Sequence, residues 1–350
     1  MRILTISFLL FAFLIAPAAA QTAPDTVVVD KQSDKKSDMP AAAKPAIAPP
    51  PVENWAVLDD LKTGLQPTAS VVVQRDEQAD FVLELVRVQW RINDPIDLWI
   101  ARPRLTVKAP VVLYLYNYSD ASDRFHDVGW CKRATADGFS AVGFVSALAE
   151  SRFKNRPMRQ WFVSELPESL GSSVHDVQLI LNYLAARGDM DMDHVGMFGM
   201  GSGASIAILA AHVDPRIKTL DLLDPWGDWP DWLEFSPLVP DAERSKYLMP
   251  EFLKSVAALD PVAHLPSLNE HNLRLQQALS DPVTPKIAKE HIAAAMPDRS
   301  QLVKYANAGD LLKAWKTTGL SGWIKQQLRP QTPKNAGDTP VAVTSTSQFD

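Results

Sequence analysis

The residues with the clearest chemical potential lie in one glycine-rich stretch between His194 and Gly203, which reads His-Val-Gly-Met-Phe-Gly-Met-Gly-Ser-Gly. The apolar run Val195–Phe198 is too short for a helix, three glycines at alternate positions follow it, and apolar residues then recur at helical spacing. This pattern predicts a strand, a tight turn and a helix. Such a corner exposes backbone N–H groups at a helix N-terminus, so it holds either a nucleophile beside an oxyanion site or a phosphate group.

Other candidate site residues end or follow predicted strands. Asn117 and Tyr118 close a buried apolar strand, Met200 lies in the glycine corner, and Asp281 and Asp310 follow the last two predicted strands. Ligands of α/β sheets bind at the carboxyl ends of the strands. We therefore expect these five residues to lie at one sheet edge, with Asn117, Tyr118 and Met200 lining a ligand site.

The elements that must position these residues alternate between strand and helix. The predicted strands are Phe81–Trp90, Ile96–Arg102, Val111–Asn117, Phe139–Ser146, Val195–Phe198, Ile217–Leu223, Leu273–Leu279 and Gln301–Tyr305. The first two form a hairpin, and helices separate most of the later ones. This order is typical of the α/β class, with a doubly wound, mainly parallel sheet and helices on both faces.

Local signals give several helix boundaries. Ser173 and Asp176 are spaced as a capping box for a helix that Gly188 ends, and Thr284 is expected to cap a helix with Pro285 at its first position. A final helix is expected to hold Leu311, Leu312, Trp315, Trp323 and Ile324 largely on one side.

An insertion of about residues 224–266 interrupts the alternation and predicts a small cap at the carboxyl edge of the sheet. Trp226, Trp229 and Trp232 are three of the chain's ten tryptophans and lie within it beside three aspartates. One interpretation is that the rings hold the cap on the sheet, because tryptophan buries a large area. The other is that they line a pocket for an apolar, aromatic or sugar-like ligand.

The composition sets the class and the compartment. The net charge of −6 without basic runs gives no sign of a nucleic-acid partner. Residues 1–20 have the charged, apolar and small-residue parts of a signal peptide, which predicts a periplasmic or secreted protein without a later membrane span. Residues 21–52 and 329–350 are expected to be disordered, so residues 53–328 form the folded domain. The one cysteine, Cys131, is expected in the core.

The glycine corner and the order of elements resemble the α/β-hydrolase superfamily, in its exported dienelactone-hydrolase-like and prolyl-oligopeptidase-like branches. The family's Gly-x-Ser-x-Gly motif aligns with Gly199–Gly203, so the resemblance puts Gly201 in the nucleophile slot. It implies that Asp281 is the retained acid and that Asp310 occupies the histidine slot. The family's His-Gly near the oxyanion hole is replaced by Asn117 and Tyr118.

Because a serine nucleophile needs a base within hydrogen-bond reach, these replacements predict the loss of standard serine-hydrolase catalysis. The expected function is binding of a small molecule or protein partner under the tryptophan-rich cap. An alternative is an active esterase or peptidase in which Ser202, otherwise a donor of its backbone N–H to the oxyanion site, is a shifted nucleophile acting with Asp281. His175, His264 or His271 is then the substitute base.

A third hypothesis is dinucleotide binding. Gly199, Gly201 and Ala204 match the spacing of a Rossmann fingerprint, and Asp221 or Asp224 lies where a ribose-binding acid is expected. The leading interpretation needs no cofactor. No metal site is expected either, because the Asp-Met-Asp-Met-Asp run at residues 189–193 lacks the glycine and glutamate of a calcium loop and is predicted to be a turn.

Overall fold

A computed structural model describes Leu58, residues 70–91, 94–117, 122–149, Arg152, and residues 162–319 and 321–329. The predicted signal peptide, linker and C-terminal tail, and Tyr118, lie outside these residues, apart from Arg329. The described residues belong to one unit, Val52–Asp350.

The unit is built on a nine-stranded sheet in the order β1-β2-β3-β5-β4-β6-β7-β8-β9. Its strands are β1 (Val71–Glu77), β2 (Phe81–Arg91), β3 (Asp94–Pro103), β4 (Ala109–Leu115), β5 (Ser140–Gly143), β6 (Met190–Met200), β7 (Ile217–Leu223), β8 (Asn272–Ala278) and β9 (Leu302–Tyr305). Strands β1 to β3 are antiparallel to their neighbours, and β5, β4, β6, β7, β8 and β9 are mutually parallel. This confirms the predicted fold class and adds β1, which the sequence did not indicate.

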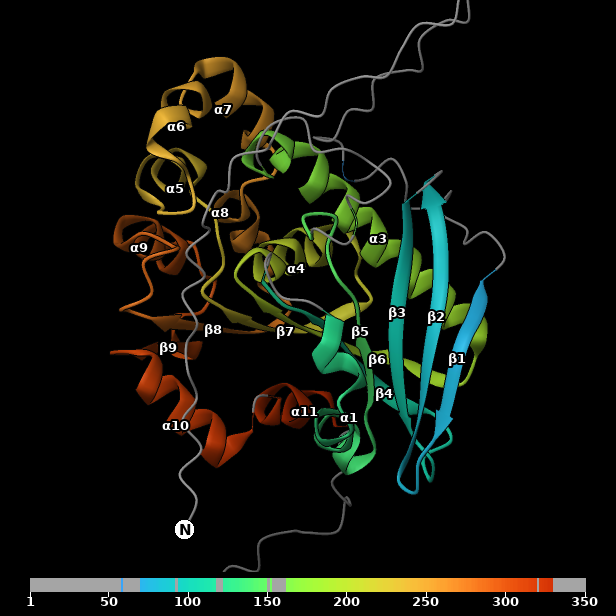
Figure 1. Cartoon of the computed structure of the whole chain (residues 1–350). Coiled ribbons are helices and arrows are strands. Elements are labelled where there is room, and N and C mark those ends of the chain that lie inside the picture. Colours follow the sequence, from blue (N-terminus) through green and yellow to red (C-terminus); the bar gives the residue numbers. More distant parts are fainter. Residues whose placement is uncertain are drawn as a thin grey trace, which may run out of the picture. The chain divides into compact units, whose positions relative to one another are not determined.

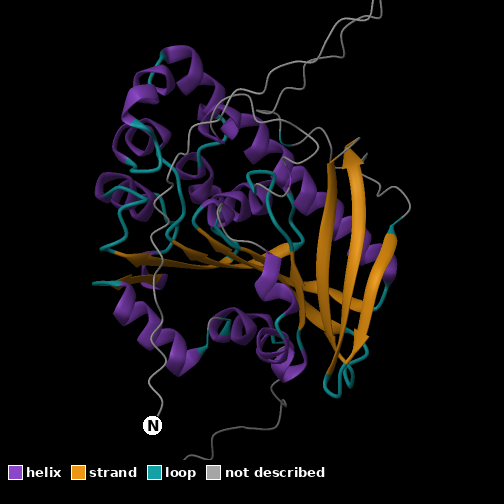
Figure 2. Ribbon diagram, in the orientation of Figure 1, coloured by secondary structure: helices purple, strands orange, loops and turns teal. Residues whose placement is uncertain are grey.

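Helices cover both faces of the sheet (Figures 1 and 2). The helices are α1 (Val128–Thr135), α3 (Leu166–Arg187), α4 (Ser202–Val213), α5 (Trp229–Phe235), α6 (Asp241–Tyr247), α7 (Pro250–Ala257), α8 (Pro261–His264), α9 (Lys286–Ala294), α10 (Ala308–Thr318) and α11 (Gly322–Leu328). None of these described helices has the length and apolarity needed to cross a bilayer.

Strand β4 shows how one sequence supplies both faces. All seven of its residues are buried, and successive side chains alternate between two hydrophobic clusters. Val111 and Leu113 pack with α3 and α4 on one face, whereas Val112 and Tyr114 pack with α1 and α11 on the other. Cys131 of α1 is fully buried in the second cluster, as expected.

Helix α3 begins earlier than its capping signal predicts, at Leu166, so Ser173 and Asp176 are not its cap. Ser173 Oγ instead accepts a hydrogen bond from the Ala147 N–H at 2.9 Å. Asp176 pairs with the buried Arg152 guanidinium at 2.9 Å, and Arg152 also reaches Asp94 of β3 at 2.8 Å. Ser173 therefore binds a buried backbone N–H and Asp176 belongs to a buried ionic network, and neither residue caps the helix.

Three other boundaries differ from the prediction. Met190 pairs with Ala109 of β4, so residues 190–193 belong to strand β6 and are not a turn. Helix α9 begins one residue later than expected, and Thr284 hydrogen-bonds the Asp224 and Pro225 carbonyls instead of capping it. The predicted final helix is two helices, α10 and α11, because α10 ends at Gly319.

Candidate functional site

The glycine corner connects β6, a central strand, to α4. Gly201 stands alone between the two elements with φ 55° and ψ −120°, a conformation that side-chain-bearing residues rarely adopt. Its N–H donates to the Leu223 carbonyl at 2.9 Å, and its own carbonyl accepts from the N–H of Ala204 and Ser205 at 3.0 and 3.2 Å. These bonds hold the turn at the carboxyl ends of β6 and β7.

Asn117, which follows β4, fills the space in front of this turn. A Cβ atom added to Gly201 would lie 2.4 Å from Asn117 Oδ1, far inside van der Waals contact. The same Oδ1 accepts hydrogen bonds from the N–H of Ser202 at 3.3 Å and from its hydroxyl at 3.4 Å. Asn117 thus fills the space in which the side chain of a nucleophile would begin. It also accepts the hydrogen bond of the Ser202 N–H, the backbone donor that would otherwise face an oxyanion.

The cavity that Asn117 borders is small. Its lining is completed by three aromatic rings and by the segment after β5: Tyr116, Phe125, Phe144, Val145, Ser146 and Ala149. The volume is about 10 Å³, the scale of one water molecule. Ser202 is fully buried beside it, so the described residues leave no room here for an acyl group.

Asp281 lies in the turn between β8 and α9 and is partnered. Its Oδ2 accepts from the Thr284 N–H at 3.3 Å and lies 3.7 Å from the ammonium group of Lys289. Lys289 is itself buried, and its Nζ donates to the Ala278 and Asp281 carbonyls at 2.7 and 2.6 Å. The acid predicted for a triad is therefore part of a buried lysine cluster.

Asp224 belongs to the same cluster. Its carboxyl accepts from the Ala278 N–H at 3.0 Å and lies 3.8 Å from Lys289 Nζ. Burial raises the pKa of Asp224 to about 7, against the opposing effect of Lys289. A titratable carboxyl group therefore lies next to the corner. From the sequence, Asp224 was predicted only as a possible ribose-binding acid.

Asp310, assigned to the histidine slot, lies in the first turn of α10 and is exposed. Asn307 caps this helix: its Oδ1 accepts from the Asp310 N–H at 3.1 Å, and its Nδ2 donates to the Asp310 carboxylate at 3.0 Å. This reciprocal pair is a helix-capping arrangement. The contacts described for Asp310 give it a structural role.

The histidines considered as substitute bases lie in other surroundings. His175 is inside α3 with its ring edge-to-face on Trp90, and burial lowers its pKa to about 4. His264 Nε2 of α8 donates to the Ala258 carbonyl at 2.9 Å, and its ring centroid lies 4.4 Å from that of His212. His271 precedes β8, at the opposite edge of the sheet from Gly201.

Comparison with solved structures gives neighbours of one kind. An acetyl xylan esterase from Paenibacillus sp. R4 superposes with a TM-score of 0.59 at 14% identity, covering 78% of this chain and 92% of its own. An acylaminoacyl peptidase from Pyrococcus horikoshii gives 0.53 at 12% identity, covering 75% of this chain and 50% of its own. A cold-adapted esterase from an Arctic intertidal metagenomic library gives 0.51 at 13% identity, covering 73% and 98%. Neither a protein-family model nor a curated protein matches the sequence itself.

The chain has an α/β-hydrolase fold. In this fold the corner after a central strand carries the nucleophile. Gly201 lies at that corner in the chain described here, because the strand ends at Met200 and the helix begins at Ser202.

The insertion of this α/β-hydrolase fold forms the cap, with α5 to α8 between β7 and β8. Trp226, Trp229 and Trp232 are each at most 1% exposed and belong to the main hydrophobic cluster. Trp229 Nε1 donates to the Leu259 carbonyl at 3.0 Å, and its ring meets that of Trp232 edge-on. The rings pack the cap onto the sheet. Trp229 also borders a cavity of about 470 Å³ on the cap, so the ligand role of the three rings stays a prediction.

Asp221, one of the two acids suggested for dinucleotide binding, is already paired in this fold. Asp221 is fully buried in β7, with its carboxylate bound to Arg274 at 2.6 Å and to Gln276 at 2.8 Å. A ribose hydroxyl would have to break this buried ion pair. Met200, at the end of β6, is half-buried among apolar side chains.

One cluster of metal-ligand residue types was not anticipated. Asp228, Asp231 and His291 bring three possible ligand atoms within 4.8 Å of one another, on α5 and α9. Burial and the neighbouring Asp231 raise the pKa of Asp228, and the hydrogen bond to Asp228 raises that of His291. No local pattern in the sequence signals this cluster because His291 lies sixty residues from Asp231. The pairing of the His291 imidazole with the Asp228 carboxylate already accounts for the geometry.

Proposed function

We propose that this chain is an exported protein that keeps the α/β-hydrolase fold but lacks serine-hydrolase catalysis, and that it acts by binding a small molecule or a protein partner. The observation that carries the proposal is the position of Asn117 Oδ1, 2.4 Å from where a side chain at residue 201 would begin. A nucleophile cannot occupy the corner while Asn117 keeps this position.

The remaining groups support the same conclusion. Catalysis by a serine requires a hydroxyl, a base that takes its proton and donors directed at the oxyanion. In this chain the corner residue has no hydroxyl, Asn117 accepts from the Ser202 N–H, and Lys289 and Thr284 surround the Asp281 carboxylate. The hydroxyl is therefore absent from the corner, and the Ser202 N–H and the Asp281 carboxylate are engaged in structural contacts.

The alternative, hydrolysis through Ser202, would require a different use of the same residue. Its hydroxyl is fully buried, and its described hydrogen bond is the 3.4 Å bond to Asn117. An amide oxygen is not a general base, since it does not take up a proton near neutral pH. Ser202 would need both a base and an opening of the corner before it could attack an ester.

Activity-based labelling tests the proposal. The purified protein is treated with a fluorophosphonate probe and with an ester reporter, beside a Ser202→Ala variant, and labelled peptides are mapped by mass spectrometry. We expect neither labelling nor turnover by either protein. Labelling at Ser202 that the variant abolishes would establish a shifted nucleophile and refute the proposal.

A designed variant makes the negative result informative. Gly201→Ser combined with Asn117→Ala restores a hydroxyl to the corner and vacates the space in front of it. Labelling of this double variant but not of the natural protein would trace the inertness to the missing hydroxyl alone. A folded double variant that stays unlabelled would show that the missing base also contributes, because the predicted histidine slot holds Asp310.

A further inference from the structure

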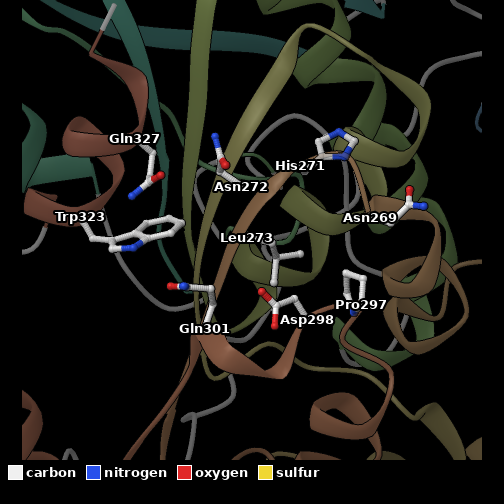
Figure 3. Close-up of a pocket in the computed structure, with 9 residues that line it drawn as sticks. All are labelled: Asn269, His271, Asn272, Leu273, Pro297, Asp298, Gln301, Trp323 and Gln327. Carbon is white, nitrogen blue, oxygen red and sulfur yellow. The ribbon is translucent and has the colours of Figure 1, made fainter. Parts of the chain in front are cut away.

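A second cavity lies at the opposite edge of the sheet from the glycine corner. It is lined at the amino ends of β8 and β9 and by α11, through Asn269, His271, Asn272, Leu273, Pro297, Asp298, Gln301, Trp323 and Gln327 (Figure 3). Strands β6 to β9 are parallel, and Gly201 follows the carboxyl end of β6. The amino-edge pocket, as we call this cavity, is therefore separate from the corner.

Three segments of the chain build this pocket. The turn into β8 supplies His271 and Asn272, the turn into β9 supplies Asp298 and Gln301, and α11 supplies Trp323 together with Gln327 four residues later. Residues four apart in a helix share one face. In Figure 3 Trp323 and Gln327 face the two turns across the cavity, with Leu273 between them.

Several of these side chains are held in place. The Arg274 guanidinium lies 4.9 Å from the centroid of the Trp323 ring and is fixed by its ion pair with Asp221 at 2.6 Å. The Asp298 carboxylate accepts from the N–H and hydroxyl of Ser300 at 2.8 and 2.7 Å. The ring and the carboxylate are thus positioned before any ligand arrives, which lowers the entropic cost of binding.

The chemistry of the lining selects a class of ligand. The nine lining residues include four side-chain amides, one carboxylate, one imidazole and one indole, and no lysine or arginine. Amides both donate and accept hydrogen bonds, so they suit hydroxyl groups, which do the same. Asp298 is the charged side chain of the lining, and the nearby Arg274 is already neutralised by its ion pair with Asp221, so the pocket disfavours phosphates and carboxylates. The indole ring offers a flat apolar surface with an N–H at its edge.

His271 supplies a further polar group. Its Nδ1 is buried and makes no hydrogen bond to another described residue. Burial lowers the pKa of His271, so the imidazole is neutral at pH 7 and can donate or accept a hydrogen bond. The volume of the pocket is about 250 Å³, below the roughly 300–1,000 Å³ of drug-sized sites, so the ligand is small.

We propose that the amino-edge pocket binds a neutral polyhydroxylated ligand, namely a single sugar residue, with one ring face packed on Trp323 and its hydroxyls bonded to the surrounding amides and Asp298. This inference does not depend on whether the glycine corner is catalytic. Binding at this pocket and labelling at the corner are therefore tested by independent measurements.

Titration of the full chain with glucose, galactose, xylose and N-acetylglucosamine tests the proposal, with binding followed by saturation-transfer NMR and calorimetry. We expect at least one of these sugars to bind at ~10 mM or below, in the range of weak single-site affinities. Glucuronate is the charged control and should bind more weakly than glucose. The proposal is refuted if none of the neutral sugars binds, or if glucuronate binds as tightly as glucose.

Variants locate the site. Gln301→Ala and Gln327→Ala should each weaken binding by about five-fold to ten-fold, as expected for the loss of one hydrogen bond. Gln326→Ala removes a neighbouring exposed amide of α11 outside the pocket and should leave the affinity unchanged. Trp323→Phe keeps a ring over Arg274 and should weaken binding with the fold intact by circular dichroism. Equal affinity in all four variants would place the sugar elsewhere and overturn the proposal.

Discussion

Residue 201 combines two separate costs for any side chain. A positive φ of 55° disfavours residues other than glycine, and the Asn117 amide stands 2.4 Å from the position of a Cβ. Gly188, which ends α3, has a φ of 71° but nothing within 4 Å of its would-be Cβ. The two glycines therefore separate the backbone cost from the steric cost.

We predict that Gly188→Ala lowers the free energy of unfolding by about 1 kcal/mol, whereas Gly201→Ala lowers it by ~3 kcal/mol or more. In an Asn117→Ala background the cost of Gly201→Ala should fall towards the backbone cost alone. Urea unfolding of the natural protein, Asn117→Ala, Gly201→Ala and the double variant forms a double-mutant cycle that measures this coupling. Additive effects at 117 and 201 would mean that the two residues do not touch.

Asp224 predicts a pH dependence. Its pKa rises from an ordinary value of 3.8 to about 7 in the folded chain, so the folded state binds a proton more tightly than the unfolded state. The contribution of this group to stability is then greatest at low pH and declines as the pH rises through that window, by at most about 1.4 kcal/mol per pH unit.

Asp224→Asn removes this titration while its amide oxygen still accepts from the Ala278 N–H. The variant should gain stability relative to the natural protein as the pH rises from about 4 to 7, measured by urea unfolding at each pH. A difference between the two proteins that stays constant over this range would contradict the raised pKa.

At the scale of elements, local signals placed the sheet well because they act over a few residues. Val195–Phe198, followed by alternate glycines, correctly predicted the strand, turn and helix around Gly201. The prediction that Ser173 and Asp176 cap a helix was wrong because the residue types that cap helices also form buried hydrogen bonds and ion pairs. Here their partners are Ala147 and Arg152. The partner that decides between the two uses lies far away in the sequence.

The Arg152 network joins β3 to α3 and predicts a large stability effect. Arg152→Met leaves the Asp176 carboxylate buried without its guanidinium and leaves Asp94 paired with Arg91 at 3.5 Å, which should cost about 3–5 kcal/mol in urea unfolding. The matched control is Arg87→Met, which removes the exposed pair with Asp97 and should cost less than about 1 kcal/mol. Similar costs for the two variants would show that burial does not set the strength of these pairs.

At the scale of the molecule, the sequence predicted the fold and the residues around the corner, but not how they touch. The contact between Asn117 and Gly201 joins residues 84 positions apart and depends on where β4 and β6 end. The buried Lys289 goes against the general exposure of lysine, so its pairing with Asp281 had no sequence signal. The tryptophans of the cap were given two interpretations, and their burial supports the packing one.

The predicted export is tested on the whole chain. Expressed in a bacterial host with two membranes, the protein should appear in the periplasm or medium with Gln21 as its first residue, because residues 1–20 carry the signal-peptide pattern. Cell fractionation and N-terminal sequencing measure this. A version starting at Gln21 should stay in the cytoplasm, and an uncleaved full chain in the cytoplasm would contradict the prediction.

The contact between Asn117 and Gly201 also limits how this chain can change. A mutation that returns serine to residue 201 meets the Asn117 amide at once, and a mutation that shortens Asn117 yields no nucleophile by itself. Neither single step is rewarded by selection for hydrolysis, and both together still leave Asp310 in the predicted histidine slot, so a route to an enzyme needs at least three substitutions. Asn117 therefore makes the gain of any side chain at residue 201 depend on a change at a second position.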